Sequence, residues 1–95
     1  MKILCEMPAY QDKVWLLVRL NNDNFAYGIR SDNNIGLAIH TNGTKLHVIS
    51  ALERNIRLCD MLLESNQVSN SQLTVVYMNE RKMAEVFLDK LRDLS

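Results

Sequence analysis

The sequence has few of the residues that interrupt or cross-link a chain: one Pro, three Gly and two Cys in 95 residues. Such low counts exclude a collagen-like repeat and a scaffold held together by many disulfides. Cys5 and Cys59 are isolated, with no CxxC pair and no histidine at the spacing of a metal ligand. We therefore predict no metal site, no cofactor and two reduced thiols that only pack.

An excess of one charge is also missing, because eleven Lys and Arg balance eleven Asp and Glu. The chain lacks the positive charge that attracts nucleic-acid phosphates, so we do not expect a nucleic-acid partner. Its longest apolar run, Val14–Val18, is far shorter than the roughly 20 residues that cross a membrane. Its start lacks the apolar core of a secretory signal. We expect no membrane partner and a cytoplasmic location.

What is present is typical of a globular protein with one domain, residues 1–95, since 47% of the residues are hydrophobic and 23% are charged. The pattern predicts an α+β fold with an antiparallel sheet of about five or six strands, beginning as an N-terminal meander. Two amphipathic helices in the C-terminal half should cover one face of the sheet. The first four strands are expected at Lys2–Met7, Lys13–Leu20, Asn24–Arg30 and Ile35–Thr41, with polar breaks between them.

Residues 9–20 allow two interpretations. Tyr10 and Leu17 fit helical spacing behind Pro8, which suits a first helical position. An alternating apolar series fits a strand instead, and we favour it: Val14, Leu16, Val18 and Leu20. Because Trp15 and Leu17 make the opposite side apolar too, such a strand should lie in the centre of the sheet.

The dipeptide Asn42–Gly43 strongly favours a type I′ hairpin turn. It predicts that Ile35–Thr41 pairs with a further strand over Thr44–Ile49. His40 and His47 would then lie near each other beside the turn. Histidine titrates near neutral pH, so this pair is the candidate for an enzymatic interpretation.

The period of the pattern changes after residue 50. Ser50 and Glu53 match a capping box, which predicts a helix over Ala51–Glu64. At helical spacing, four apolar residues form its core-facing stripe: Leu52, Ile56, Cys59 and Leu63.

The remainder predicts one more strand and one more helix. After a polar connection over residues 65–71, Gln72–Met78 has the apolar run of a buried strand. Asn79 is expected to cap a second helix that continues to the end of the chain. Its apolar face should contain Met83, Ala84, Phe87, Leu88, Leu91 and Leu94.

Sequence motifs that carry known chemistry are missing. The chain contains no GxxxxGK[ST] phosphate loop, no GxGxxG, no HExxH and no GxSxG. Apart from the His40 and His47 pair, no acid, base or nucleophile stands at a spacing that implies cooperation. The sequence therefore favours a protein without a catalytic site.

The leading functional hypothesis is a small, cytosolic, non-catalytic protein-interaction module, acting as a regulator, adaptor, inhibitor or immunity-type protein. On the helix predicted over Ala51–Glu64, Leu58 and Met61 point away from the core stripe, next to Arg54 and Arg57. Such a mixture of Met, Leu and Arg suits a protein contact. The partner could be another protein or a second copy in a homodimer, and an exposed sheet edge offers a second route to pairing.

The alternative hypothesis is a small-molecule or nucleotide-binding sensor with an anion site at the sheet edge. One predicted face of the meander is apolar: Phe25, Tyr27, Ile29, Ile35, Leu37 and Ile39. The opposite face carries small residues that would let a helix, a second copy or a flat ligand approach closely: Ala26, Gly28, Gly36 and Ala38. The candidate ligands of a phosphate or carboxylate are Arg19, Arg30, His40 and Lys45.

Overall fold

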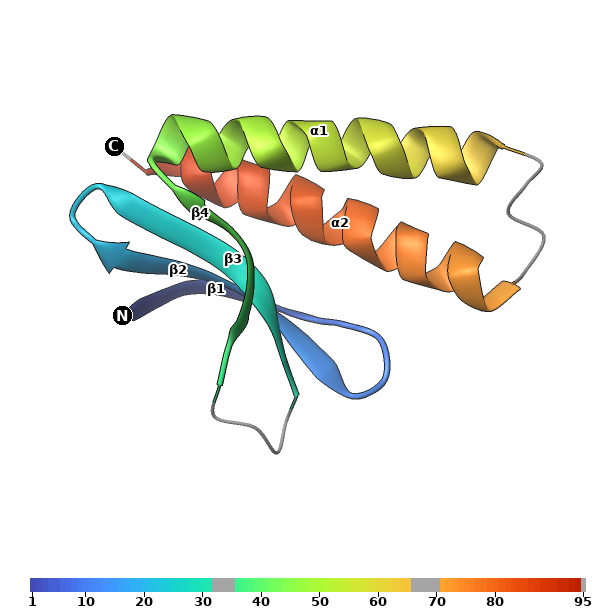
Figure 1. Ribbon diagram of the computed structural model, residues 1–95, viewed down its shortest axis with the longest axis horizontal. Coiled ribbons are helices and arrows are strands. Elements are labelled where there is room, and N and C mark those ends of the chain that lie inside the picture. Colours follow the sequence, from blue (N-terminus) through green and yellow to red (C-terminus); the bar gives the residue numbers. More distant parts are fainter. Residues whose placement is uncertain (32–35, 66–70, 95) are drawn as a thin grey trace.

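The computed structural model describes residues 1–31, 36–65 and 71–94. Four strands and two helices follow one another in the described chain: β1 (Lys2–Pro8), β2 (Lys13–Asn21), β3 (Asn24–Ser31), β4 (Ala38–Gly43), α1 (Lys45–Glu64) and α2 (Ser71–Asp93). The strands form one antiparallel sheet in the order β1-β2-β3-β4, and both helices lie on one side of it (Figure 1). The predicted α+β fold is confirmed, but the described residues form four strands rather than five or six.

The strand β2 confirms the favoured interpretation of residues 9–20. It pairs with β1 on one side and β3 on the other, which is the central position that apolar residues on both faces predicted. The turn before it contains Gln11 and Asp12, with φ of 57° and 58°. Four consecutive residues of β2 have no exposed surface: Trp15, Leu16, Leu17 and Val18.

The predicted hairpin at Asn42–Gly43 is wrong, because Thr44–Ile49 is not a strand and α1 begins at Lys45. The Thr44 side chain accepts a hydrogen bond from the backbone N–H of His47 at 3.3 Å, as an N-cap does. Val48 already belongs to the buried stripe of α1 that continues through Leu52. The helical period therefore starts before Ser50, and the predicted capping box is also wrong.

The predicted strand Gln72–Met78 is the first part of α2 instead. A short apolar run does not by itself distinguish a strand from a helix. Here the helix satisfies its own backbone groups while Leu73 and Val75 remain exposed.

Asn79 lies inside α2 and is not a cap. Its side-chain oxygen accepts a hydrogen bond from Trp15 Nε1 at 2.7 Å, and its Nδ2 donates to the carbonyl of Pro8 at 3.0 Å. The residue therefore joins α2 to the first two strands.

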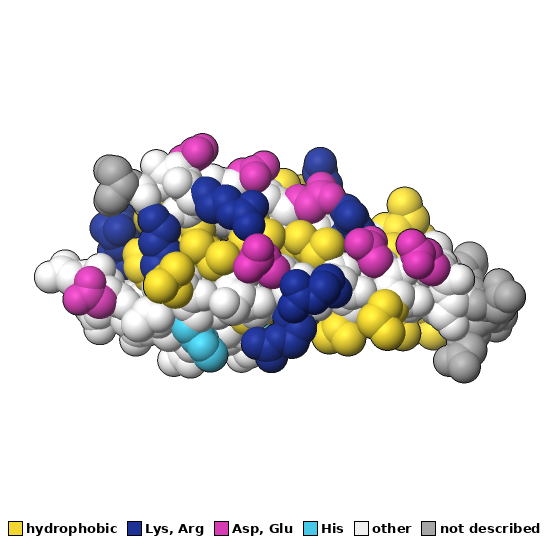
Figure 2. Space-filling view, turned by 90° about the horizontal axis from the view of Figure 1, so that it is seen from above, with side chains coloured by type: hydrophobic (Ala, Val, Ile, Leu, Met, Phe, Trp, Pro, Cys, Tyr) yellow, Lys and Arg dark blue, Asp and Glu magenta, His cyan; other side chains and the backbone are white. Residues whose placement is uncertain are grey.

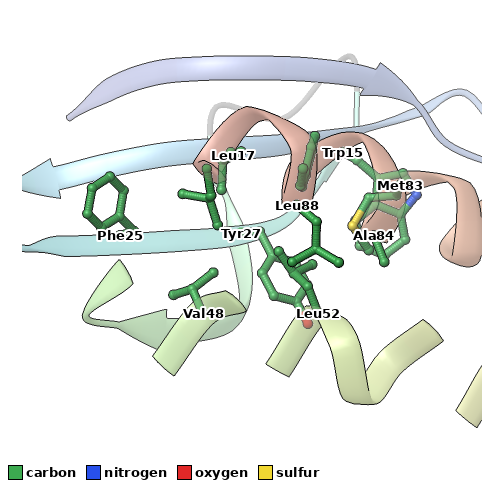
Figure 3. Packing of buried hydrophobic residues seen from close by; sticks show 11 residues of the cluster. Trp15, Leu17, Phe25, Tyr27, Val48, Leu52, Met83, Ala84 and Leu88 are labelled. Carbon is green, nitrogen blue, oxygen red and sulfur yellow. The ribbon is translucent and has the colours of Figure 1, made fainter. Parts of the chain in front are cut away.

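The main core fills the space between the sheet and the helices (Figure 3). Trp15 and Phe87 are its largest side chains without exposed surface. The other members are Leu17, Phe25, Tyr27, Val48, Leu52, Met83, Ala84, Leu88 and Leu91. Leu16, Val18 and Ala26 form a second, smaller cluster with Leu37 against it. This second cluster explains why β2 is apolar on both faces.

A register shift in β4 reverses part of the predicted face assignment. Tyr27 pairs with Thr41, but Gly28 pairs with Ile39, so His40 is an extra residue in the ladder. The His40 ring lies 5.1 Å from the ring of Trp15, centroid to centroid. His40 is therefore on the side of the core, whereas Ile39 shares the opposite side with Gly28.

The small residue at Gly28 allows a close backbone approach, as the sequence suggested, and the approaching group is β4 itself. A Cβ at Gly28 would lie 2.1 Å from the carbonyl oxygen of Ala38. The predicted break after Arg30 begins one residue too early, because Ser31 still belongs to β3. Residues 32–34 of that break, the start of the predicted strand at Ile35 and residues 66–70 of the predicted connection lie outside the described residues.

Neither α1 nor α2, over the residues described, is long and apolar enough to cross a membrane. Likewise, no group of three or more His, Cys, Asp or Glu side chains suited to a metal ion occurs within the described ranges.

Candidate functional site

The helix pair is longer than the sheet that it covers. In Figure 1, the end of α1 and the start of α2 extend beyond the strands. The buried residues of α2 in the described chain accordingly lie between Met83 and Leu91. Since no strand lies beneath the extended part, apolar side chains there remain in contact with solvent.

Six large apolar side chains on this extended part are between 37% and 66% exposed: Leu58, Met61, Leu62, Leu73, Val75 and Met78. We call these six residues the distal helix surface. Figure 2 shows hydrophobic side chains near these helix ends in separate groups, with acidic side chains between them. Leu58 and Met61 were predicted from the sequence as interaction residues, and the structure places both on this surface.

Arg54 and Arg57, the other two predicted interaction residues, are exposed on α1 just before Leu58. The ion pairs found in the described chain use other arginines. Arg81 pairs with Asp60 at 2.5 Å and also with Glu85, and these contacts join α2 to α1. The hydrogen bonds to Asp60 and Glu85 raise the pKa of Arg81. Arg54 and Arg57 take part in none of these pairs, so their charges are available beside the distal helix surface.

Polar side chains from both helices and from the sheet interact where the helix pair leaves the sheet: Tyr27, His40, Thr41, Asn55 and Glu80. Burial raises the pKa of the Glu80 carboxyl, and the positive charge of His40 and a hydrogen bond with Asn55 partly oppose this effect. Burial also raises the pKa of Tyr27, whose side-chain hydrogen bond with Thr41 acts in the opposite direction. The group links α1, α2 and β4 at the edge of the core.

The predicted pair of His40 and His47 does not share one environment. His40 packs against Trp15 and Tyr27. His47 is in the first turn of α1, where its Cδ2 would be 2.7 Å from a Cβ on Gly43. The two histidines were expected to be close because of a hairpin that the structure does not form.

Both cysteines are free. Burial raises the pKa of the Cys59 thiol, which disfavours the reactive thiolate.

A second candidate site is a cleft of about 580 Å³ at the other end of α1. Its lining contains Arg19, Asn22, Asp23, Phe25, Thr44, Lys45, Leu46 and Leu94. We call it the cationic cleft. The register of the strands explains why these residues meet. Arg19 pairs with Phe25, and Phe25 pairs with Gly43, so the three form one row across the sheet. Lys45 follows Gly43 after one residue.

Of the four predicted anion ligands, the structure brings Arg19 and Lys45 together in this cleft. Arg30 pairs with Val14, five residues along β3 from Phe25, a separation of about 16 Å. His40 lies against Trp15, outside the lining of the cleft.

Arg19 is held at its place in the cleft by packing. Its guanidinium carbon lies 5.0 Å from the centroid of the Phe25 ring. Its Nε atom is buried and has no hydrogen-bond partner within the described part of the chain. Lys45 Nζ donates to the carbonyl oxygen of Leu94 at 2.5 Å, which connects the start of α1 to the end of α2.

Comparisons with protein-family models, with curated proteins and with solved structures each found no match to this chain.

Proposed function

We propose that this protein is a small, non-catalytic, cytoplasmic protein-interaction module that docks another protein through the distal helix surface. The supporting observation is the number of large apolar side chains, six among the described residues, that are exposed on the extended part of the helix pair. Single exposed apolar residues are ordinary on a soluble protein, but six of them on the ends of two neighbouring helices indicate a contact surface. Two of them, Met61 and Met78, are flexible and polarisable and adapt to an irregular partner surface.

The charges next to the surface indicate the chemistry of the partner. Arg54 and Arg57 are exposed beside Leu58, and guanidinium groups at the edge of an apolar contact favour carboxylates on the other side. A symmetric contact between two copies would place the same surface on both sides. It would therefore bring a second Arg54 and a second Arg57 to the same contact. We accordingly propose a different protein, with an apolar patch bordered by Asp or Glu.

A photo-cross-linking experiment tests this docking site in the cells that make the protein. Benzoylphenylalanine replaces Met61 in one variant and Leu46 in a second. Leu46 is the matched control, because it is a 77% exposed leucine at the opposite end of α1. We expect the Met61 position to give one discrete adduct, and adding Met78→Asp should abolish it.

Three results would overturn the proposal. The first is that the Met61 position gives no adduct. The second is that the Met61 and Leu46 positions give the same adducts. An adduct of twice the 11.0 kDa chain mass would identify a second copy as the occupant and contradict a separate partner.

A further inference from the structure

We propose that the cationic cleft is a binding site for a small organic anion. Arg19 and Lys45 would hold its phosphate or carboxylate group, and its apolar body would lie against Phe25, Leu46 and Leu94. This inference is independent of protein docking through the distal helix surface. Met61 on that surface follows Lys45 by sixteen residues of α1, or about 24 Å along the helix.

Arg19 has a buried donor that is not hydrogen-bonded within the described residues. A buried polar atom normally has a hydrogen-bond partner, because leaving it without one carries the full cost of desolvation. The Nε of Arg19 is buried and has none among the described residues, and Arg19 lines the cleft. A guanidinium presents several donors in a planar fork that matches two oxygens of a phosphate or carboxylate.

Lys45 brings a second cation to the cleft. It is the first residue of α1, and its ammonium group donates to the carbonyl oxygen of Leu94 at the end of α2, where a cation is favourable and keeps further N–H donors for an anion. The first turn of α1 contains no acidic residue, and the cleft lining contains one carboxylate, that of Asp23, against two cations. An anion in the cleft would balance the excess of one positive charge in its lining. The first N–H groups of a helix also point outward without partners within the helix.

The size and lining of the cleft indicate an organic ligand. Its volume of about 580 Å³ is much larger than a single oxyanion requires. Phe25, Leu46 and Leu94 provide apolar surface beside the two cations. Leu46 is 77% exposed, so a bound apolar group would remove it from water.

The test is a titration of the full chain, followed through the backbone amide signals of a ¹⁵N-labelled sample by NMR. The probes are phenyl phosphate and benzoate, with inorganic phosphate and benzyl alcohol as controls. We expect saturable shifts at Thr44, Lys45 and Leu46 with at least one organic anion. Benzyl alcohol should give none, and inorganic phosphate should bind at least about tenfold more weakly, because it has no apolar body. The tighter of phenyl phosphate and benzoate identifies which acidic group the cleft prefers.

Variants test which cations hold the anion. Arg19→Gln and Lys45→Gln should each weaken binding by at least about tenfold, whereas Arg30→Gln, the matched control at the other end of β3, should not change it. Because Arg19 also packs on Phe25, Arg19→Lys provides a second variant that keeps the charge and loses the planar fork. It should bind more weakly than the unmodified protein.

The proposal is overturned if neither organic anion gives saturable shifts at the start of α1. Equal affinities for Lys45→Gln, Arg19→Lys and Arg30→Gln would overturn it as well. Met61→Asp should leave the titration unchanged, so this result is separate from the test of protein docking.

Discussion

At the scale of the residue, Asn79 has the clearest structural role. It accepts from Trp15 Nε1 and donates to the carbonyl of Pro8. Asn79→Ala would leave the N–H of a fully buried tryptophan without a partner, and we expect the free energy of unfolding to fall by about 1 to 3 kcal/mol. Urea denaturation measures this loss. Asn22→Ala is the control, because Asn22 is exposed, and it should change the free energy of unfolding by less than about 0.5 kcal/mol. Equal losses would contradict the assigned roles.

Glu80 should make stability depend on pH. Burial raises the pKa of its carboxyl above the ordinary value of 4.5, so the folded chain binds this proton more tightly than the unfolded chain does. Linkage then requires the Glu80 contribution to stability to fall as the pH rises above 4.5. Glu80→Gln should therefore raise the melting temperature at pH 7, and the gain should shrink towards pH 4. Thermal denaturation at several pH values measures this gain, and a constant gain would contradict the assignment.

At the scale of the element, the start of α1 depends on Thr44. Thr44→Ala removes the hydrogen bond to the His47 N–H, and we expect a loss of about 1 kcal/mol in the free energy of unfolding. Ser50→Ala is the control, because Ser50 lies exposed inside the helix and its substitution should change stability by less than about 0.5 kcal/mol. Chemical denaturation of both variants makes the comparison. A larger loss for Ser50→Ala would restore the cap predicted from the sequence.

Elements with an unambiguous period were predictable from the sequence. The central position of β2 followed from apolar residues on both of its faces, and the second half of α2 followed from the spacing of Met83, Phe87 and Leu91. The start of α1 was not predictable in the same way. Asn42–Gly43 favours a hairpin locally, but the packing of Val48 in the core and the cap at Thr44 favour a helix. These contacts form only in the folded chain, so the local sequence does not reveal them.

The same limit applied to the distal helix surface. Leu58 and Met61 were found because they point away from the core stripe of a helix that was correctly expected there. Leu73, Val75 and Met78 were missed because their run was assigned to a buried strand. Helical spacing over residues 71–94 was the signal that could have found Val75 and Met78, since it places Met78 opposite Phe87. It places Leu73 in line with Leu91, on the side of the core, so the exposure of Leu73 follows only from the helix extending beyond the strands. In the cationic cleft, Arg19 and Lys45 followed from the meander, whereas the register shift at His40 was not visible in the sequence.

At the scale of the whole molecule, the two candidate sites lie at opposite ends of α1. The cationic cleft is at the end where the sheet meets the helices, and the distal helix surface is at the end that extends beyond the sheet (Figure 1). The core of Trp15, Phe87 and their neighbours holds the first end together. The distal residues contribute little to that core, so the extended part can be substituted without unfolding the chain.

Met61→Asp tests this separation of stability from binding. Met61 is largely exposed, so the substitution should change the free energy of unfolding by less than about 0.5 kcal/mol. Met83→Asp, with the same change of side chain at a fully buried position, should unfold the protein or lower its stability by several kcal/mol. Thermal denaturation followed by circular dichroism distinguishes the two outcomes. A large loss for Met61→Asp would show that Met61 belongs to the core.

The most direct test of the proposed function is native mass spectrometry of the protein purified gently from the cells that make it. We predict a complex of the 11.0 kDa chain with a different protein in fixed stoichiometry. Met61→Asp should abolish this complex, and Leu46→Asp should leave it intact. A bare monomer from the unmodified chain, a homodimer, or the same complex from Met61→Asp would contradict docking of a separate protein on the distal helix surface.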